Sequence, residues 1–368
     1  MKLIKSTVAG QHRHVTPIAL DSFTGCKRAF STRNVPVEAM QTLVSGDVAP
    51  RPGDLVLARV DRLRQHLRLE LPDGRRTRLF RGDHILVCYG NRYAPDQYES
   101  LVPESLAPCD LVAAGGIASL VRHRHPGIKR ATQITPLGLV GNKAGSVLNV
   151  GAWKIDCGNQ KPRNVPLFLV VGSSMNSGKT TTAARIVRGL VLDGFKVGAM
   201  KVTGTGSGGD LWHFLDAGAS CALDFTDAGH ASTYGLNHDS VLGIVALLGT
   251  SISNQHVDAI VVEVADGLLQ AETNALLHNA LFRNQISGVF HAAVDVHSAI
   301  YGVDYLQKLG YNLIAVSGVV SSSPLARNEF IDACDVPICT KNELFSPGFG
   351  LYLMESVSNK AGTKLAEA

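Results

Sequence analysis

The stretch LFLVVGSSMNSGKTTTAARIV, residues 167–187, constrains the fold of this chain more than any other. Its apolar start, residues 167–172, predicts a buried strand, and the residues after Gly178 predict a long helix. A glycine-containing turn between a strand and a helix brings backbone amides and the positive end of the helix dipole to one point. We therefore expect this turn to bind an anion, and Lys179 makes phosphate a suitable ligand.

The residues of this loop each have an expected role. Gly178 lets the backbone approach the phosphates, Lys179 would reach the β- and γ-phosphates, and Thr180 would place its hydroxyl on Mg²⁺. Five residues separate Gly172 from Gly178, one more than in the usual pattern. Thr181 would lie near the α-phosphate. The predicted nucleotide-binding residues are Ser174, Asn176, Ser177, Gly178, Lys179, Thr180 and Thr181.

The second half of the chain, from residue 161, alternates apolar strand-like runs with amphipathic helices. This alternation is typical of a parallel sheet with helices on both faces. We therefore predict an α/β fold and a P-loop nucleotide-binding domain over residues 161–368. Strands are predicted at 167–172, 196–202, 259–264, 289–296, 312–320 and 336–340, and helices at 178–194, 210–219 and 238–251.

The first half of the chain has a different sequence pattern. Runs of alternating apolar and polar residues at 54–60, 66–71, 77–81 and 84–89 predict short antiparallel strands, with a hairpin turn at LPDGRR. From Ile85 to Asn149 the pattern indicates a small α/β region. Residues 1–160 carry 22 Lys and Arg against 13 Asp and Glu, whereas residues 161–368 carry 13 against 18. We therefore predict a separate N-terminal domain, β-rich with a small α/β part, over residues 1–160.

The predicted N-terminal strands carry many arginines on their outward faces. A solvated face, or a docking surface for the acidic second half, explains them best. Because only 6% of the chain is aromatic, and no base-stacking platform lies among these arginines, we do not expect a nucleic-acid partner. The arginines are Arg62, Arg64, Arg68, Arg75, Arg76 and Arg78.

The cysteines and the apolar runs bear on the compartment. There are seven cysteines, an odd number, and no CxxC motif, which argues against a disulfide framework and a structural zinc site. The N-terminal residues lack a continuous apolar stretch, and no apolar run is long enough to span a bilayer. We expect a cytoplasmic protein with no membrane partner, a small-molecule substrate and a homo-oligomeric state.

The motifs resemble two families. The loop with five intervening residues resembles that of dethiobiotin synthetase, and SMNSGKTTT is similar to the loop of the molybdopterin-guanine dinucleotide biosynthesis protein B family. Both belong to the SIMIBI class of P-loop NTPases. GFKVGAMKVTGTG and IVVEVADGLL are similar to further segments of dethiobiotin synthetase, and GGDLWHFLDAGAS to a segment of the protein B family. The resemblance covers roughly residues 165–345.

This resemblance implies an ATP- and Mg²⁺-dependent site. Thr180, Asp210 and Glu263 would hold the metal, and Lys201 would lie beside the γ-phosphate. Lys201, Glu263 and Asp266 are the expected catalytic residues. From the residues alone, Asp210 also reads as a helix N-cap and Glu263 as a buried carboxylate paired with a cation. TKNE, residues 340–343, echoes a guanine-binding motif, but we favour ATP over GTP.

Polar loops at the predicted strand ends favour a small-molecule substrate. The loop 224–235 is the favoured substrate loop, and Asp295 and His297 are further candidates. We prefer an ATP-dependent, ligase- or kinase-like enzyme that activates a small carboxylate- or amine-containing metabolite. An accessory protein like protein B is one alternative. An acyl-CoA-dependent acyltransferase is another, because the two-domain layout is also similar to that of the D-glutamate N-acetyltransferase family.

Overall fold

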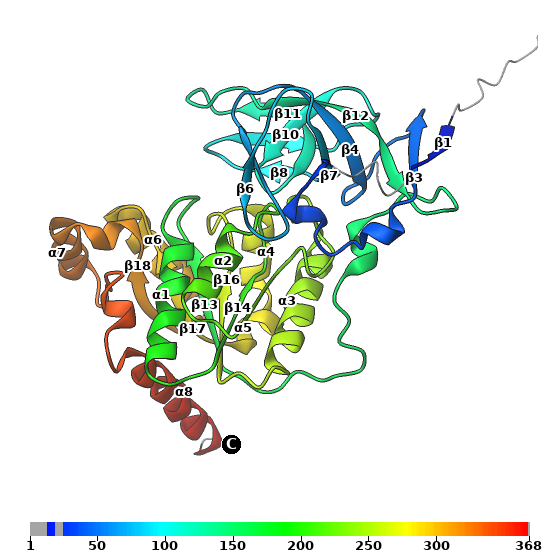
Figure 1. Cartoon of the computed structure of the whole chain (residues 1–368). Helices are drawn as coiled ribbons and strands as arrows, with labels where there is room; N and C mark the ends of the chain where they lie inside the picture. The colour runs from blue at the N-terminus through cyan, green and yellow to red at the C-terminus, as the bar shows by residue number, and fades with distance from the viewer. Residues whose placement is uncertain (1–12, 19–24, 367–368) are drawn as a thin grey trace, which may run out of the picture. The chain divides into compact units, whose positions relative to one another are not determined.

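The computed structural model describes residues 13–18 and 25–366, with side chains described as far as residue 357. Contacts within the chain divide it into two compact units, which Figure 1 shows in the colours of the chain. The first unit comprises Met1–Arg92 and Tyr98–Trp153, and the second comprises Tyr93–Gln97 and Lys154–Ala368. The predicted domains, residues 1–160 and residues 161–368, stay predictions.

The first unit is built on a ten-stranded sheet. Because β10 pairs with both β11 and β12, the strands β4, β7, β11, β10 and β12 close into a ring. Apolar side chains on alternate positions of these strands, such as Val56, Ile85 and Leu111, form the core of the unit. The strands are β1 (Arg13–Pro17), β2 (Lys27–Arg28), β3 (Thr42–Gly46), β4 (Leu55–Arg62), β7 (His84–Tyr89), β8 (Arg92–Tyr93), β9 (Tyr98–Leu101), β10 (Cys109–Ala113), β11 (Ile117–Arg124) and β12 (Thr132–Gly141).

The small α/β region expected between Ile85 and Asn149 was wrong, because the described residues there form strands β7 to β12 and no α-helix. The run CDLVAAGGIASLV is a hairpin of two strands, in which Ala113 pairs with Ile117. Gly116, at a φ of 95°, makes the tight turn between them. A β-carbon there would lie 2.1 Å from that of Ala29, so only glycine fits.

The hairpin predicted at LPDGRR is confirmed. It joins β5 (Arg68–Glu70) to β6 (Arg76–Arg78), which pair antiparallel. The Leu71 amide donates to the Arg75 carbonyl at 2.9 Å, and Gly74 adopts a φ of 84° within the turn. The strand predicted at 77–81 is shorter than expected, and Phe80 beyond its end is 59% exposed.

The second unit contains a six-stranded parallel sheet in the order β15-β14-β16-β13-β17-β18. This arrangement, with its helices, confirms the predicted α/β fold (Figure 1). The strands are β13 (Leu167–Gly172), β14 (Val197–Lys201), β15 (Cys221–Asp224), β16 (Ala259–Glu263), β17 (Ile286–Ala292) and β18 (Leu313–Ser317). The helices are α1 (Lys179–Leu192), α2 (Gly209–Asp216), α3 (His238–Ser253), α4 (Ala271–His278), α5 (Ala280–Gln285), α6 (Val296–Lys308), α7 (Pro324–Ala333) and α8 (Phe349–Ala366).

One predicted strand is wrong, and one strand was not predicted. Residues 336–340 do not form a strand. They make only an isolated bridge, between Ile338 and Val316. Strand β15 was not predicted, because its four residues CALD are too short and too mixed in polarity to show a period.

The parallel sheet is covered on both faces, as its sequence pattern requires. Along β13, Phe168 and Val170 face the cluster that contains α1 residues, whereas Leu169 and Val171 face the cluster that contains α3 residues. The strand is therefore apolar at every position rather than alternating. Within the described part of the chain, no helix is long and apolar enough to cross a membrane. All seven cysteines are free thiols.

The strand register brings three carboxyl ends together. Glu263, the last residue of β16, pairs with Val170 of β13 on one side and with Lys201, the last residue of β14, on the other. The loop after Gly172 therefore starts at the same edge of the sheet as Lys201 and Glu263. Open parallel sheets bind their ligands at this edge.

Candidate phosphate-binding site

The loop between β13 and α1 has the strand–loop–helix geometry of a phosphate-binding loop. Gly178 precedes the helix at a φ of 99°, and Asn176 also lies in the left-handed region at 64°. A β-carbon at Gly172 would lie 2.3 Å from the Ser177 Oγ atom, so the loop closes tightly on its first glycine. The Lys179 ammonium donates to the Ser174 carbonyl at 2.7 Å across the loop. The second unit therefore has a P-loop nucleotide-binding fold.

The predicted loop residues have different surroundings. Ser177 is buried, and its hydroxyl has no hydrogen-bond partner among the described residues. The Ser174 hydroxyl donates to the Met175 carbonyl, and Thr181 is exposed at the start of α1. The Asn176 amide donates to the Asp96 carboxylate at 2.8 Å.

Asp96 is the residue at this loop that the sequence did not suggest. It belongs to Tyr93–Gln97, the short segment that is part of the second unit although it lies far from the loop in the chain. In the same segment the Tyr93 ring lies 5.5 Å from the Tyr234 ring. Nothing in the sequence near Asp96 signals a contact across 80 positions.

Lys201 lies between two of the predicted carboxylates. Its ammonium forms an ion pair with Asp210 of α2 and lies 3.5 Å from Glu263 Oε1. The Thr180 hydroxyl donates to the same Glu263 oxygen at 3.0 Å. The structure thus brings Thr180, Lys201, Asp210 and Glu263 together directly beside Lys179. Among the described residues, no group of three His, Cys, Asp or Glu side chains is arranged to hold a metal ion.

Burial and charge decide the protonation of this cluster. Burial raises the pKa of Glu263, and the nearby Lys201 opposes this shift. Burial lowers the pKa of Lys201, but Asp210 and Glu263 together hold it above its usual range. Burial also raises the pKa of Asp210, whereas Lys201 holds it below its usual value. Lys201 therefore stays charged at neutral pH, and its charge offsets the repulsion between the buried Glu263 and the half-buried Asp210.

The charges of the same cluster also act on Lys179. Burial lowers its pKa, and the nearby charge of Glu263 opposes this shift. The side chain is only 7% exposed. An anionic ligand that enters the loop would stabilise the charged form of this buried ammonium group.

Asp266, in the turn after β16, lies close to the loop. Its φ of 64° is uncommon for a residue with a side chain, and its charge acts on both Lys179 and Lys201. At the next position, Gly267, a β-carbon would lie 2.6 Å from the Ser173 carbonyl oxygen. The turn is thus fixed against the first residues of the phosphate loop, which places Asp266 at this edge of the sheet.

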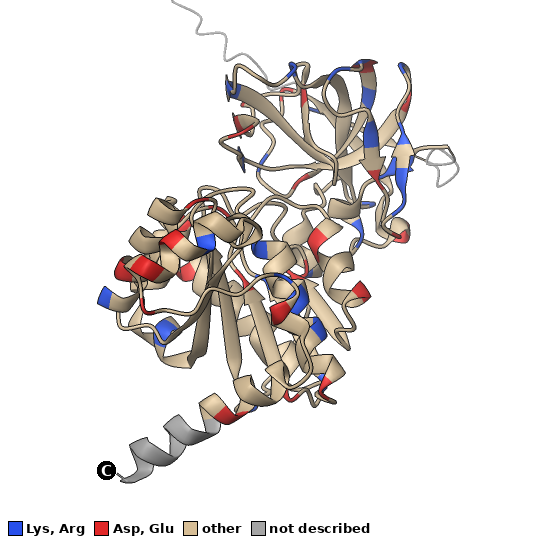
Figure 2. Ribbon diagram, turned by 90° about the vertical axis from the view of Figure 1, so that its left-hand side faces the viewer, with Lys and Arg blue, Asp and Glu red and all other residues tan. Residues whose placement is uncertain are grey.

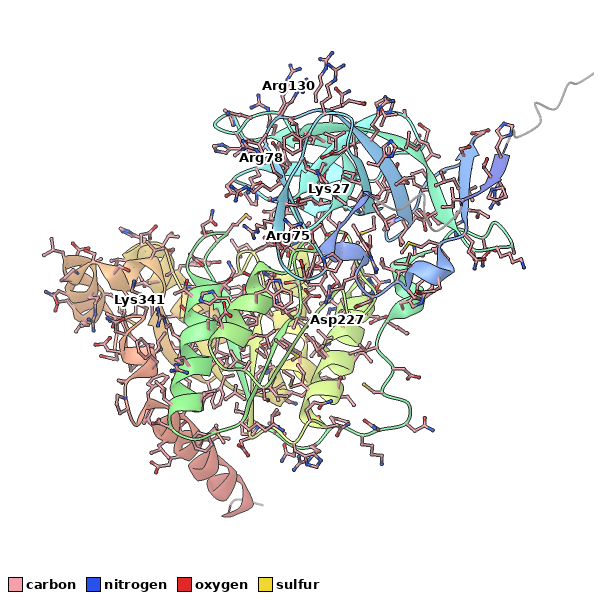
Figure 3. All side chains as sticks on the ribbon, viewed as in Figure 1. Lys27, Arg75, Arg78, Arg130, Asp227 and Lys341 are labelled. Carbon is pink, nitrogen blue, oxygen red and sulfur yellow. The ribbon has the colours of Figure 1, made fainter. Side chains whose placement is uncertain are left out.

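The loop 224–235 uses most of its polar side chains for its own structure. The Asp224 carboxylate accepts from the Thr226 amide at 2.8 Å, and Asp227 Oδ2 accepts from the Asp224 amide at 3.0 Å (Asp227 is labelled in Figure 3). The Thr233 hydroxyl accepts from the Gly204 amide at 2.8 Å. A role for this loop in holding a substrate therefore stays a prediction.

Other candidate residues cap helices or close turns. Asp295 is the N-cap of α6 and accepts from the Ser298 amide at 2.8 Å. In the guanine-like segment, Glu343 accepts from the Thr340 amide at 2.6 Å and pairs with Arg327 at 3.1 Å. The hydrogen bond from the Thr340 backbone lowers the pKa of Glu343. Its carboxylate thus already has partners within the chain.

Comparisons with known proteins give distant structural similarities. A scan against protein-family models and a search of curated proteins found no match. Among solved structures, the signal recognition particle receptor FtsY from Elizabethkingia anophelis matches with a TM-score of 0.35 at 14% identity, over 56% of this chain and 69% of that chain. Chloroplast FtsY from Physcomitrella patens matches with 0.36 at 13% identity, over 55% and 68%. The kinase domain of the Escherichia coli tyrosine kinase ETK matches with 0.31 at 12% identity, over 42% and 66%.

The P-loop assignment depends on the geometry of the loop itself. The two families that the sequence resembles are not among these three structures, so those resemblances stay predictions.

Proposed function

We propose that the second unit binds Mg²⁺ and ATP and transfers the γ-phosphoryl group to a small carboxylate- or amine-containing metabolite. The observation that supports this proposal is the convergence of Lys179, Thr180, Lys201 and Glu263 at the adjoining ends of β13, β14 and β16. Phosphoryl transfer depends mainly on positioning and on neutralising charge, and this edge of the sheet offers both.

The phosphates would lie in the loop between Gly172 and Thr180. The backbone amides and the start of the 14-residue helix α1 favour an anion there. The Lys179 ammonium now donates to the Ser174 carbonyl, and a β- or γ-phosphate oxygen would replace that partner.

The residues at the loop fit a magnesium ion bound partly through water. Glu263 is 1% exposed, and its Oε2 atom has no hydrogen-bond partner among the described residues. A buried carboxylate oxygen without a donor is costly, which makes it a good position for a cation or its water ligands. Thr180 and Glu263 would hold the ion, with Asp210 nearby, and the ion would neutralise charge on the phosphates.

Lys201 would stabilise charge on the transferred group. Its ammonium is fixed by Asp210 and Glu263 and so needs no reorganisation when a phosphoryl group arrives. Asp266 would accept the proton of an amine or orient the acceptor. In this proposal Lys201, Glu263 and Asp266 are the catalytic residues.

Replacing Glu263 with glutamine tests this assignment. The amide keeps the size of the side chain but removes its charge, so we expect basal ATP hydrolysis to fall about 100-fold, roughly 2.7 kcal/mol of transition-state stabilisation. We also expect ATP affinity to depend less on Mg²⁺ than it does in the wild type. Hydrolysis and calorimetric titration, each with and without Mg²⁺, measure both effects.

Glu272→Gln is the matched control. Glu272 is another buried carboxylate of the second unit. It accepts from the Gly235 amide at 2.5 Å and from the Gln270 side-chain amide, and a glutamine oxygen can keep the first of these contacts. This variant should hydrolyse ATP at close to the wild-type rate. Wild-type hydrolysis and Mg²⁺ dependence in Glu263→Gln would contradict the proposed role of Glu263.

A further inference from the structure

Three surface segments of the first unit form a strongly basic surface, which we call the basic face. They are residues 62–68, 76–78 and 122–130, and none of them contains Asp or Glu. Figure 2 shows Lys and Arg recurring along neighbouring strands of the first unit. The cations of the basic face are Arg62, Arg64, Arg68, Arg76, Arg78, Arg122, Arg124, Lys129 and Arg130.

Hydrogen bonds join these segments, although they lie far apart in the sequence. The Gln65 amide donates to the Arg130 carbonyl at 3.1 Å, and the Arg64 amide donates to the Thr132 hydroxyl at 3.0 Å. In the hairpin, Arg68 and Arg78 occupy directly paired positions. The side chains of Arg78 and Arg130 project outward from the first unit (Figure 3).

A shared support lies beneath the basic face. The Tyr98 hydroxyl donates to the Lys129 carbonyl at 2.5 Å, and the Tyr98 ring lies 6.1 Å from the ring of His66. Tyr98 is 1% exposed. The segments 122–130 and 62–68 therefore both contact the same buried side chain, which holds them next to each other.

Carboxylates of the first unit leave much of this charge unbalanced. Glu70 is 3.9 Å from Arg76, and Glu99 pairs with His123. No carboxylate among the described residues lies within ion-pair distance of Arg68, Arg78 or Arg130. Like charges directly opposite each other on paired strands are destabilising. An external anion that contacts both Arg68 and Arg78 would relieve the repulsion between them.

We propose that the basic face binds the sugar–phosphate backbone of a nucleic acid. All but one of its cations are arginines, whose planar guanidinium groups bind phosphate oxygens in pairs. Contacts to the backbone alone need no stacking platform, so the low aromatic content does not oppose them. The structure places the segment 122–130 beside the arginines of the predicted strands, so the basic surface is larger than those strands alone indicate.

Fluorescence anisotropy with short labelled RNA and DNA oligonucleotides tests this proposal on the full chain. We expect the wild type to bind both, or RNA better, with an affinity that falls steeply between about 50 and 200 mM salt. In Arg68→Gln/Arg78→Gln we expect binding at low salt to weaken at least about tenfold. The slope of log affinity against log salt should become shallower by roughly 1.5, because two phosphate contacts are lost. The thermal midpoint should not fall, since the substitutions remove a repulsive pair.

The matched control is Arg51→Gln/Lys143→Gln, which removes the same charge from exposed positions near the opposite ends of β4 and β12. This variant should lose little affinity. Equal losses in the two double variants would overturn the proposal, because they would indicate only an effect of net charge. Absence of binding to either nucleic acid at about 50 mM salt, or tighter binding to poly-glutamate than to RNA and DNA, would also overturn it, the latter in favour of an acidic protein.

Discussion

Replacing Lys179 with methionine should almost abolish the stabilisation of this protein by Mg²⁺ and ATP. A ligand at 100 times its dissociation constant stabilises the folded state by about 2.7 kcal/mol. Loss of the charge-assisted contacts of a buried ammonium should weaken binding about 100-fold, because such contacts contribute roughly 1.5–3 kcal/mol each. At the same ATP concentration the stabilisation would then fall to about 0.4 kcal/mol. The shift of the thermal midpoint with ATP measures this difference.

Methionine suits this experiment because it keeps most of the apolar stem of the lysine. The matched control is Lys196→Met, at the opposite edge of the sheet, where the Lys196 ammonium donates to the Gln255 carbonyl at 2.6 Å. That variant should respond to ATP as the wild type does. An undiminished midpoint shift in Lys179→Met would contradict the phosphate-binding role of the loop.

Replacing Lys201 with methionine should destabilise the second unit by about 3–5 kcal/mol, since removing one partner of a buried ion pair leaves uncompensated charge. Here both Asp210 and Glu263 would lose their cation. Urea-induced unfolding measures the loss, and the fluorescence of Trp212 on α2 provides a signal from this region. Asp210→Asn combined with Lys201→Met should recover part of the loss, because one of the two opposed carboxylates is then neutral.

The pH dependence of this variant has a definite sign. Without Lys201, burial and mutual repulsion raise the pKa of both Asp210 and Glu263 in the folded state, so protonation relieves the repulsion. The difference in stability from the wild type should therefore shrink as the pH falls from 7 towards the ordinary carboxyl range of about 4. Lys308→Met is the control, because Lys308 pairs with Asp304 at an exposed position and should change stability by less than about 0.5 kcal/mol. A similar small effect in Lys201→Met would contradict the charge balance of the cluster.

Much of the second unit could be predicted because its signals are local. The apolar run 167–172 and the residues Gly178 and Lys179 specify a strand, a turn and a helix within a short stretch. Strand ends of a parallel sheet meet at one edge, so Lys201 and Glu263 could be expected to lie near the loop. The bridging of Asp210 and Glu263 by the Lys201 ammonium could not be predicted, because it depends on how α2 directs Asp210 back towards β14.

Features that depend on distant parts of the chain were missed. The closure of the ring by β10 and β12, and the contact of Asp96 with Asn176, join positions whose local sequence carries no sign of the partner. The run CDLVAAGGIASLV was misread because a buried hairpin and a strand followed by a helix have the same apolar composition. In the loop 224–235, the sequence did not show that Asp224 and Asp227 accept hydrogen bonds from backbone amides of the same turn.

Calorimetric titration of the wild-type protein with ATP, GTP and acetyl-CoA, each with and without Mg²⁺, tests the central claim most directly. We expect ATP to bind, with an affinity that Mg²⁺ increases, because Glu263 and Thr180 lie where the ion would meet the phosphates. Binding of GTP in place of ATP would keep the site and change only the base. Binding of acetyl-CoA without any effect of Mg²⁺, and no binding of either triphosphate, would contradict the proposed function and favour acyl transfer.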